Sequence, residues 1–381
     1  MPGFECIGKE EQQALNDVFE KSGGVLYRYG LNDRRKNIFR VDDFEKAIAK
    51  RVGTQHAHCV CNGTAALKIG LFALGVKPGD EVITQSFTFI ATVEAILELS
   101  AIPVITEIDE TLTMDPSDLE KKITSKTRVI IPVHMAGVSA RMDEIMDIAK
   151  KHSIPIFEDS AQALGAMYKG KQLGTLGTAG IYSFDIGKVI TTGEGGALVT
   201  NSQEMYQKAR EYSDHGHECN PNVPRGKDTR TIWGFNYKMM ELQGAVGLAQ
   251  LQKLDAILEK QRAHKHALKE ALTDTLPNLK FRELPDEKGD AGDTLIFFLE
   301  SRKKAHSVAQ HLKENGIGTK NLPDAVNWHF AGTWNHIFSD TSQWPQSENL
   351  LRRAIALPIM VEMDNKRIEF IAEKVKEAIE K

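Results

Sequence analysis

From about residue 56 to residue 200, short apolar runs alternate with segments in which apolar residues recur at helical spacing. Short apolar runs rich in β-branched residues predict strands over residues 81–84, 103–107, 128–133, 154–158 and 180–184. Segments of helical periodicity lie between them, such as 142–151 and 63–74, where Leu67, Leu71 and Leu74 share one face. Strands that alternate with helices in this way are typical of a parallel sheet covered on both faces, so we expect an α/β fold.

A longer helical pattern follows. Leucines recur at three- and four-residue spacing from Leu248 to Leu258, in a segment that continues until Pro277 stops it. Beyond it, a small α+β domain is indicated by a strand-like run and two amphipathic helices, over residues 295–299, 307–315 and 365–381. The sequence therefore predicts a large domain over residues 1–250, and a linker helix with a small C-terminal domain over residues 251–381.

Composition narrows the class of protein. The 381 residues are 41% hydrophobic and 26% charged, and the net charge of -4 gives no basic excess for binding nucleic acid or an anionic membrane. Four cysteines without C-x-x-C spacing predict neither a disulfide framework nor a structural zinc site. The N-terminal segment is polar, and no run approaches the ~18 apolar residues of a membrane span. We expect a soluble, cytoplasmic protein whose partners are small molecules and other protein chains.

Two carboxylates end the strand predicted over residues 154–158. Glu158 and Asp159 stand at its carboxyl end, which is where open α/β sheets bind their ligands. Because successive strand residues point to opposite faces, the two side chains need not share a role. An acid in this place could equally cap a following helix.

Lys188 follows the strand predicted over residues 180–184. The glycines at Gly193, Gly195 and Gly196 permit positive φ and close backbone approach, so the chain can leave Lys188 in a loop at the crevice and enter a hairpin. A lysine in a loop is usually a solvated surface charge. Whether Lys188 has a functional role therefore depends on the other segments that the fold brings to the same crevice.

A third segment places Gly63 and Thr64 at the mouth of an apolar helix. Backbone N–H groups and the helix dipole at such a point suit a phosphate, although a plain capped helix would look the same. Together the three segments supply a phosphate cradle, an acid for a pyridine nitrogen and an amine for a Schiff base, which are the needs of pyridoxal 5'-phosphate (PLP) chemistry. We predict a PLP enzyme in which Lys188 holds the cofactor and, once released, moves the substrate proton.

Five segments occur in order over residues 62–251: NGTAAL, SFTFIAT, EDSAQALG, SFDIGKVITTGEGGALVT and GFNYKMMELQGAVGLAQL. Together they resemble the sugar aminotransferases of the DegT/StrS family. The resemblance implies an aspartate-aminotransferase-like fold (PLP fold type I), with a mostly parallel sheet in the large domain. It also implies a homodimer with active sites at the subunit interface, and L-glutamate as the amino donor to a keto or aldehyde sugar.

Carried over by position, the resemblance implies that Lys188 is the Schiff-base lysine and that Asp159 partners the pyridine nitrogen. Gln162 would lie near the ring hydroxyl, and Phe89 would stack on the ring. Without the resemblance, Phe89 is better interpreted as a core aromatic residue of a strand-to-helix turn.

The resemblance also implies a set of phosphate ligands. Gly63, Thr64 and Ser183 would bind the phosphate group, joined by Asn236 from the other subunit of the dimer. Asn236 taken alone would be a turn residue ahead of a helix.

Three further segments lie outside the cofactor motifs: MPGFE at the start, SDHGHE at 213–218 and NWHFAGTWNHI at 327–337. They resemble members of the family that aminate carbon 8 of an oxidised 3-deoxy-octulosonate destined for lipopolysaccharide. A nucleotide-linked keto-sugar is the alternative acceptor. His215 and His329 are the candidates for substrate contact, although a solvated or structural role for His215 and packing against Trp328 for His329 stay open.

Other chemistries have less support. The H-x-H pairs at His56 and His58, and at His215 and His217, lack a third ligand at suitable spacing, so no metal site is predicted. No G-x-G-x-x-G follows an early strand, as a nicotinamide-dependent enzyme would need. A non-catalytic regulator would be expected to lose Lys188 or the acid, and dehydratases of the family carry histidine in place of the lysine.

Overall fold

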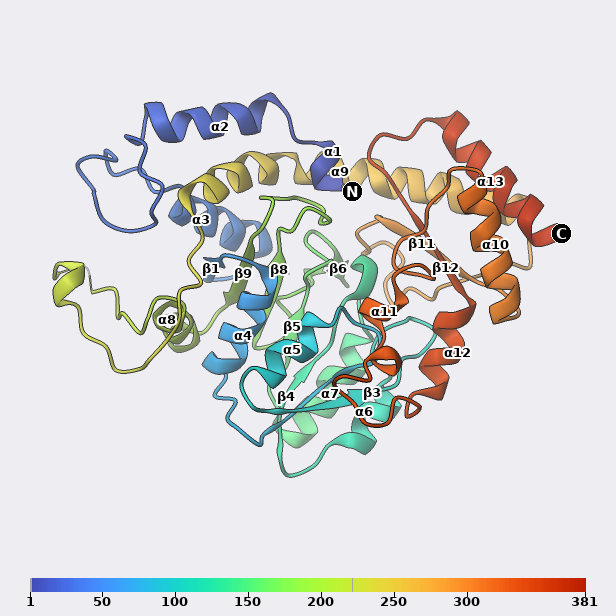
Figure 1. Ribbon diagram of the computed structural model, residues 1–381, viewed down its shortest axis with the longest axis horizontal. Helices are drawn as coiled ribbons and strands as arrows, with labels where there is room; N and C mark the ends of the chain where they lie inside the picture. Colours follow the sequence, from blue (N-terminus) through green and yellow to red (C-terminus); the bar gives the residue numbers. More distant parts are fainter. Residues whose placement is uncertain (1, 221) are drawn as a thin grey trace.

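The computed structural model of the protein describes residues 2–220 and 222–381, so Met1 of the MPGFE segment lies outside the described residues. Its central feature is a twisted sheet at the middle of the molecule (Figure 1). One part has the strand order β1-β9-β8-β5, with bounds His56–Val60, Gly196–Thr200, Ala179–Ser183 and Phe157–Asp159. The other part has the order β3-β2-β4, with bounds Ile102–Thr106, Glu81–Gln85 and Thr127–Ile131.

Two parallel bridges join these parts into one sheet. Ile130 pairs with Ile156, and Val133 pairs with Asp159, so β4 lies beside β5. Strand β9 is antiparallel to both β1 and β8, whereas β5 with β8, and β2 with β3 and β4, pair in parallel. The predicted α/β fold with a mostly parallel sheet is confirmed.

Helices pack on both faces of this sheet because its strands are apolar on both sides. Val129 of β4 belongs to the hydrophobic cluster that contains helices α4 (Gly63–Ala73) and α5 (Ala91–Leu97), while the next residue, Ile130, belongs to the cluster on the opposite face. That second cluster includes residues of α3 (Arg40–Val52) and α7 (Met142–His152). Successive residues of one strand therefore contribute to two cores, as expected for a buried parallel sheet.

Helix α4 is more deeply buried than its predicted single apolar face suggests. Nine of its 11 residues are buried, and a Cβ atom at Gly70 would come within 2.1 Å of the ring of Phe157 in β5. The glycine therefore allows the helix to lie directly on the sheet. This close packing fixes the first turn of α4, at Gly63, relative to the carboxyl ends of the strands.

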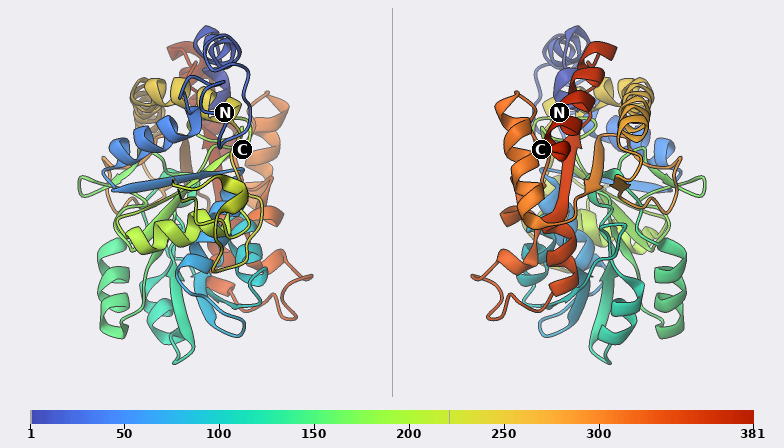
Figure 2. Two further views of the ribbon diagram at one scale, coloured as in Figure 1. Left: turned by 90° about the vertical axis from the view of Figure 1, so that its left-hand side faces the viewer. Right: turned by 90° about the vertical axis from the view of Figure 1, so that its right-hand side faces the viewer.

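The C-terminal part forms a second, antiparallel sheet with the order β10-β11-β12. Helix α9 (Glu241–Thr275) runs from the large sheet to this part along one side of the molecule (Figure 1). Its residue Leu254 packs in the core with α3 and α7, whereas Leu268 packs in the C-terminal core. In Figure 2 (right), which looks onto the right-hand side of Figure 1, the C-terminal elements face the viewer. The strands are Lys280–Phe281, Thr294–Phe298 and Ala354–Pro358, and the larger helices here are α10 (Arg302–Glu314), α12 (Pro345–Arg353) and α13 (Asn365–Glu380).

Shorter elements complete the chain. The helices are α1 (Pro2–Glu5), α2 (Lys9–Glu20), α6 (Pro116–Lys122), α8 (Gln203–Tyr212) and α11 (Val326–His329). The 3-10 turns are η1 (Met135–Gly137), η2 (Arg225–Lys227) and η3 (Ala331–Thr333), and a small hairpin is formed by β6 (Met167–Tyr168) and β7 (Lys171–Gln172). Within residues 2–220 and 222–381, no helix is both long enough and apolar enough to cross a membrane.

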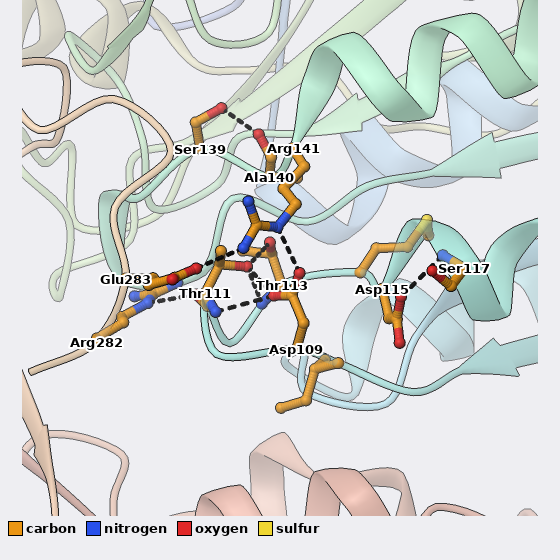
Figure 3. A network of polar contacts seen from close by, with 12 residues as sticks. Asp109, Thr111, Thr113, Asp115, Ser117, Ser139, Ala140, Arg141, Arg282 and Glu283 are labelled. Atoms are coloured by element: carbon orange, nitrogen blue, oxygen red, sulfur yellow. Dashed lines mark hydrogen bonds and ion pairs between the residues drawn. The ribbon is translucent and has the colours of Figure 1, made fainter. Parts of the chain in front are cut away.

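The C-terminal part is joined to the large sheet by polar contacts. The side chain of Arg282 donates to the backbone carbonyl of Thr111, and Arg141 pairs with both Asp109 and Glu283 (Figure 3). Burial lowers the pKa of Arg282 to about 9.

The division of the chain near residue 250 stays a prediction, since residues beyond it contact both parts.

Segment 326–330 illustrates this sharing. The backbone N–H of Thr88 donates to the backbone carbonyl of His329 at 3.0 Å, and the N–H of Ile90 donates to the backbone carbonyl of Trp328 at 3.1 Å. Val326 and Phe330 also belong to the hydrophobic cluster of α4 and α5. This segment therefore lies against the loop that follows β2.

Candidate active site

A cavity of about 770 Å³ lies at the carboxyl ends of β5 and β8. Its walls come from widely separated stretches of sequence, because α4, the β2–α5 loop, the β8–β9 loop and the C-terminal part all reach it. The cavity is lined by eight of the residues predicted from the sequence: Gly63, Thr64, Phe89, Asp159, Gln162, Ser183, Lys188 and His329. The structure thus brings the three sequence segments together.

Asp159 is the last residue of β5 and is almost fully buried. Its Oδ2 accepts a hydrogen bond from the hydroxyl of Thr92 at 2.7 Å, and its Oδ1 accepts one from the N–H of Ala161 at 3.1 Å. Burial raises the pKa of Asp159, and these hydrogen bonds oppose that shift. A cation placed at this carboxylate would favour its ionised form.

Glu158 has a different environment on the opposite face of the strand. Its carboxylate is fully buried and accepts hydrogen bonds from three backbone N–H groups of the loop 174–177 and from His134. The question left open by the sequence, which of the two acids faces the crevice, is answered in favour of Asp159. Glu158 instead fixes the neighbouring loop.

Lys188 lies in the loop between β8 and β9, which pair as an antiparallel hairpin. The backbone holds it from two sides, since its N–H donates to the carbonyl of Asp185 and its own carbonyl accepts from the N–H of Gly3, each at 3.0 Å. Burial lowers the pKa of Lys188, while the carboxylates of Asp185 and Asp159 raise it. A lowered pKa increases the fraction of neutral amine, which is the nucleophilic form.

The first turn of α4 faces the end of β8. The side chain of Asn62 caps the helix by accepting from the N–H of Ala65 at 2.8 Å, while the N–H groups of Gly63 and Thr64 have no carbonyl partner within the helix. A Cβ atom at Gly63 would lie 2.9 Å from the Cβ of Ser183, so only glycine permits this close approach. The helix start and the Ser183 hydroxyl together form a cradle that suits a phosphate.

Phe89 and His329 lie on the same side of the cavity. Phe89 is 43% exposed, which is unusual for an aromatic core residue, and its ring centre lies 5.4 Å from that of His329. His329 is buried, its Nδ1 lies 2.9 Å from the carbonyl of Ala325, and burial lowers its pKa. Trp328 is 61% exposed, so the two neighbours do not form a buried pair. The amide oxygen of Gln162 accepts from the N–H of Ala136 at 2.9 Å.

Two predicted residues do not line this cavity in the same chain. Asn236 and His215 are both exposed, on a loop region where Asp214 and Asn236 form an isolated bridge. Asp214 is buried between Arg225 and Lys238, which anchors this loop. For Asn236 this position is compatible with the expectation that it reaches the site of the other subunit, which stays a prediction. His215 was expected to contact substrate, and its own chain does not bring it to the cavity.

Three histidines of the H-x-H pairs contact other side chains of the protein. His58 lies between Glu45 and Ser213, and His56 stacks on Tyr206. His217 lies 3.5 Å from a carboxylate of Asp228. In the part of the chain that the structure describes, no cluster of three or more His, Cys, Asp or Glu side chains could hold a metal ion.

Several cavity residues were not singled out from the sequence. Thr92 and Asp185 lie inside motifs that were recognised, so their place could have been anticipated from those motifs. Asp293, Lys320 and Asn321 carry no local signal, because they reach the cavity only through the packing of the C-terminal part. Their role had to come from the tertiary structure.

The residues around this cavity fit PLP. The cradle at Gly63 and Ser183 matches a phosphate, the buried carboxylate of Asp159 matches a protonated pyridine nitrogen, and the amine of Lys188 shares their cavity. The cavity is also within the size range of cofactor sites.

Comparisons with known proteins agree with this chemistry. The model of the DegT/DnrJ/EryC1/StrS aminotransferase family matches residues 7–376. A pleiotropic regulatory protein of Geobacillus stearothermophilus is 32% identical over 376 residues, covering 98% of this chain and 95% of that protein. A GDP-perosamine synthase of Caulobacter vibrioides is 42% identical over 214 residues, which is 56% of each chain. The solved structure of 3-amino-5-hydroxybenzoic acid synthase has a TM-score of 0.85 and 26% identity, covering 100% of this chain and 98% of that chain.

Proposed function

The chain belongs to the DegT/DnrJ/EryC1/StrS aminotransferase family, and on that premise we propose that it moves an amino group from L-glutamate to carbon 8 of an oxidised 3-deoxy-octulosonate. Membership makes it a PLP-dependent sugar aminotransferase. The observation that supports the amino transfer is the cavity shared by Lys188, Asp159 and the start of α4 at Gly63. The choice of acceptor is supported by the resemblance of the segments MPGFE, SDHGHE and NWHFAGTWNHI. The product would be an amino sugar for lipopolysaccharide.

Bound PLP supplies an electron-withdrawing ring beside the substrate carbon that loses its proton. In our proposal Lys188 would bind the cofactor and, once released, would take the proton from the substrate carbon that bears the amino group, a role that the lowered pKa of its amine favours. Asp159 holds the pyridine nitrogen, and the positive charge there stabilises a carboxylate that burial alone would disfavour. Gly63, Thr64 and Ser183 hold the phosphate.

The remaining cavity residues orient the substrate and the ring. Phe89 presents its exposed face to the cavity and is proposed to stack on the ring, with Gln162 near the ring hydroxyl. His329 belongs to the NWHFAGTWNHI segment and reaches the same cavity, which supports a contact with the acceptor sugar.

We also propose that the active enzyme is a homodimer in which Asn236 completes the phosphate site of the partner. Asn236 and His215 lie on an exposed loop whose aromatic residues Trp233 and Phe235 are 65% and 39% exposed. Exposed apolar groups of this kind usually mark a contact surface. In the dimer, a second copy of the chain would cover these aromatic residues. Asn236 and His215 of the first copy would then lie near the cavity of the second copy.

A nucleotide-linked keto-sugar is the second candidate acceptor. It is favoured by the 42% identity to the GDP-perosamine synthase, which extends over 56% of this chain. A non-catalytic regulatory role has less support, although one relative is named as a regulatory protein, because Lys188 and Asp159 are both present in the cavity.

The test mixes purified protein with L-glutamate and either an oxidised 3-deoxy-octulosonate or nucleotide-linked keto-sugars, and follows the release of 2-oxoglutarate. We expect sustained release with the octulosonate and none in the Lys188→Ala variant, which keeps the rest of the cavity. Turnover only with nucleotide-linked sugars would refute the acceptor. Release at the wild-type rate by Lys188→Ala would refute the role of the lysine.

A further inference from the structure

We propose that Lys320, held in place by Asp293, forms a carboxylate-binding subsite in the wall of the active-site cavity. The inference rests on the proposed function, because the ligand would be a substrate of the amino transfer. It adds the group in the cavity wall that would bind the carboxylate of such a substrate and so select for substrates that carry one.

The pair is built into the cavity wall. The Nζ of Lys320 contacts Oδ2 of Asp293, whose Oδ1 accepts from the hydroxyl of Thr294 at 3.0 Å. The side chain of Asp293 is only 5% exposed, whereas that of Lys320 is 23% exposed, and both residues line the cavity. The lysine is thus the member of the pair that a ligand can reach.

The backbone around Lys320 is also fixed. Its N–H donates to the carbonyl of Ala356 in β12 at 2.8 Å, and its carbonyl accepts from the N–H of Leu322 at 2.9 Å. The lysine therefore stands on an extension of the C-terminal sheet, and its ammonium group is held by a buried carboxylate. Such preorganisation lowers the entropy cost of binding an anion.

Acidic side chains outnumber lysines in the lining of the cavity, so a carboxylate ligand requires a cation to bind there. Among the described residues, the charged lining consists of two lysines and four acids: Lys188, Lys320, Asp159, Asp185, Glu194 and Asp293. Lys188 is committed to the cofactor in the proposed function. A carboxylate entering this acidic cavity would be repelled and desolvated unless a cation met it, and Lys320 is the remaining lysine of that lining.

Lys320 is able to hold two anions at once. An ammonium group has three N–H donors, and Asp293 needs only one of them. Hydrogen bonds between an ammonium group and a carboxylate are among the stronger ones in proteins. The charge of Lys320 is also felt inside the cavity, since it adds to burial in lowering the pKa of Lys188 and of His329.

A nearby pair shows what a purely structural arrangement looks like. Lys265 of α9 pairs with Asp290, and their side chains are 11% and 8% exposed. Neither residue lines the cavity. This second pair offers a matched control for the loss of a buried lysine–aspartate contact.

The first experiment measures binding of glutarate, a dicarboxylate without an amine, to the PLP-loaded protein by calorimetry. We expect Lys320→Met to weaken glutarate binding by roughly ten- to a hundredfold, from the strength of hydrogen bonds to charged groups. Lys265→Met should leave glutarate affinity unchanged, and Lys320→Arg should restore most of it. Equal affinity in the wild type and Lys320→Met would overturn the subsite.

The carboxylate can come from the amino donor or from the acceptor, so the second experiment separates these sources. Single-turnover conversion of the bound cofactor is compared for L-glutamate, its α-amide and its side-chain amide, and the return step is compared for an acceptor acid and its methyl ester. Whichever preference for the free carboxylate disappears in Lys320→Met identifies the carboxylate that Lys320 binds. If all preferences persist in the variant, the subsite is wrong.

Loss of Lys320 leaves Asp293 buried without its partner, which can prevent folding. A double variant, Lys320→Met with Asp293→Asn, removes both charges together and keeps the amide near Thr294. It should show the same loss of glutarate affinity, and wild-type affinity in this folded variant would also refute the subsite.

The two proposals fail in different ways. If the wild type binds glutarate through Lys320 but never transfers the amino group of glutamate, the proposed function is wrong while a carboxylate subsite stands. If Lys320→Met transfers amino groups with unchanged affinity for carboxylate substrates, the subsite is wrong and the proposed function stands.

Discussion

Replacing Glu158 by glutamine is expected to destabilise the folded protein strongly. The fully buried carboxylate accepts hydrogen bonds from the backbone N–H groups of Gly174, Leu176 and Gly177 at 2.6–2.8 Å, and lies 3.0 Å from Nε2 of His134. The Nδ1 of that histidine accepts from a backbone N–H, so its Nε2 must be the donor towards Glu158. Four donors thus converge on one carboxylate.

The size of the effect follows from these contacts. Each oxygen of Glu158 serves two donors, and glutamine keeps only one oxygen, so its amide NH2 would face two N–H groups that have lost their acceptor. A hydrogen bond to a charged group is worth about 1.5–3 kcal/mol, which gives a loss of about 3–6 kcal/mol for two. This is a large part of the ~5–15 kcal/mol that stabilises a typical domain.

The free energy of unfolding would be measured by urea titration at neutral pH, without added cofactor. The control is Glu204→Gln, which changes a carboxylate whose side chain is 79% exposed and whose partner Lys208 is 46% exposed, and it should cost less than about 1 kcal/mol. A cost of less than about 1 kcal/mol for Glu158→Gln as well would show that the four donors find water or other acceptors. The reasoning about this loop would then be wrong.

Three further predictions concern other sites. Burial lowers the pKa of His58 to about 4, so between pH 6.5 and 4 the unfolded chain takes up a proton that the folded chain refuses. Stability should fall by roughly 2–3 kcal/mol over that decrease in pH, and His58→Asn should lose this part of the pH dependence; identical urea profiles for the two proteins would contradict it. Thr92→Val removes the hydroxyl donor of Asp159 and should weaken PLP binding about tenfold in a titration followed by absorbance, whereas an unchanged Kd would assign the hydroxyl no role. Gly70→Ala places a methyl group 2.1 Å from the ring of Phe157 and should lower stability by about 1–3 kcal/mol, so an unchanged or higher Tm would disprove the close packing.

Much of the sheet was predictable, because buried parallel strands are continuous apolar runs. The strand predicted over residues 81–84 is found at Glu81–Gln85, and that over 180–184 at Ala179–Ser183. The strand predicted over 154–158 is shorter, at Phe157–Asp159, since Pro155 has no N–H for a sheet hydrogen bond. Strand β1 was not singled out, because His56 and His58 interrupt its apolar character.

The residues that line the cavity were easiest to anticipate where the sequence signal is local, although their roles stay predictions. Asp159 ends a strand, Gly63 starts a helix and Lys188 lies in the loop that follows a strand, and the topology of the sheet brings such points to one edge. The exposed position of His215 and the approach of Lys320 to the cavity depend on how distant segments pack. No periodicity or motif in a single sequence records that packing.

The residues that line the cavity are far apart in the sequence, which affects when in folding the cavity can form. The helix start at Gly63, the acid at Asp159 and the amine at Lys188 meet only in the assembled sheet, so in the proposed function no short fragment would bind the coenzyme. A ligand that binds only the native state shifts the equilibrium away from unfolded chains, by about 2.7 kcal/mol at a hundred times its Kd. In the proposed function, supply of the coenzyme would therefore lengthen the survival of each copy against proteolysis, as well as set how many copies can react.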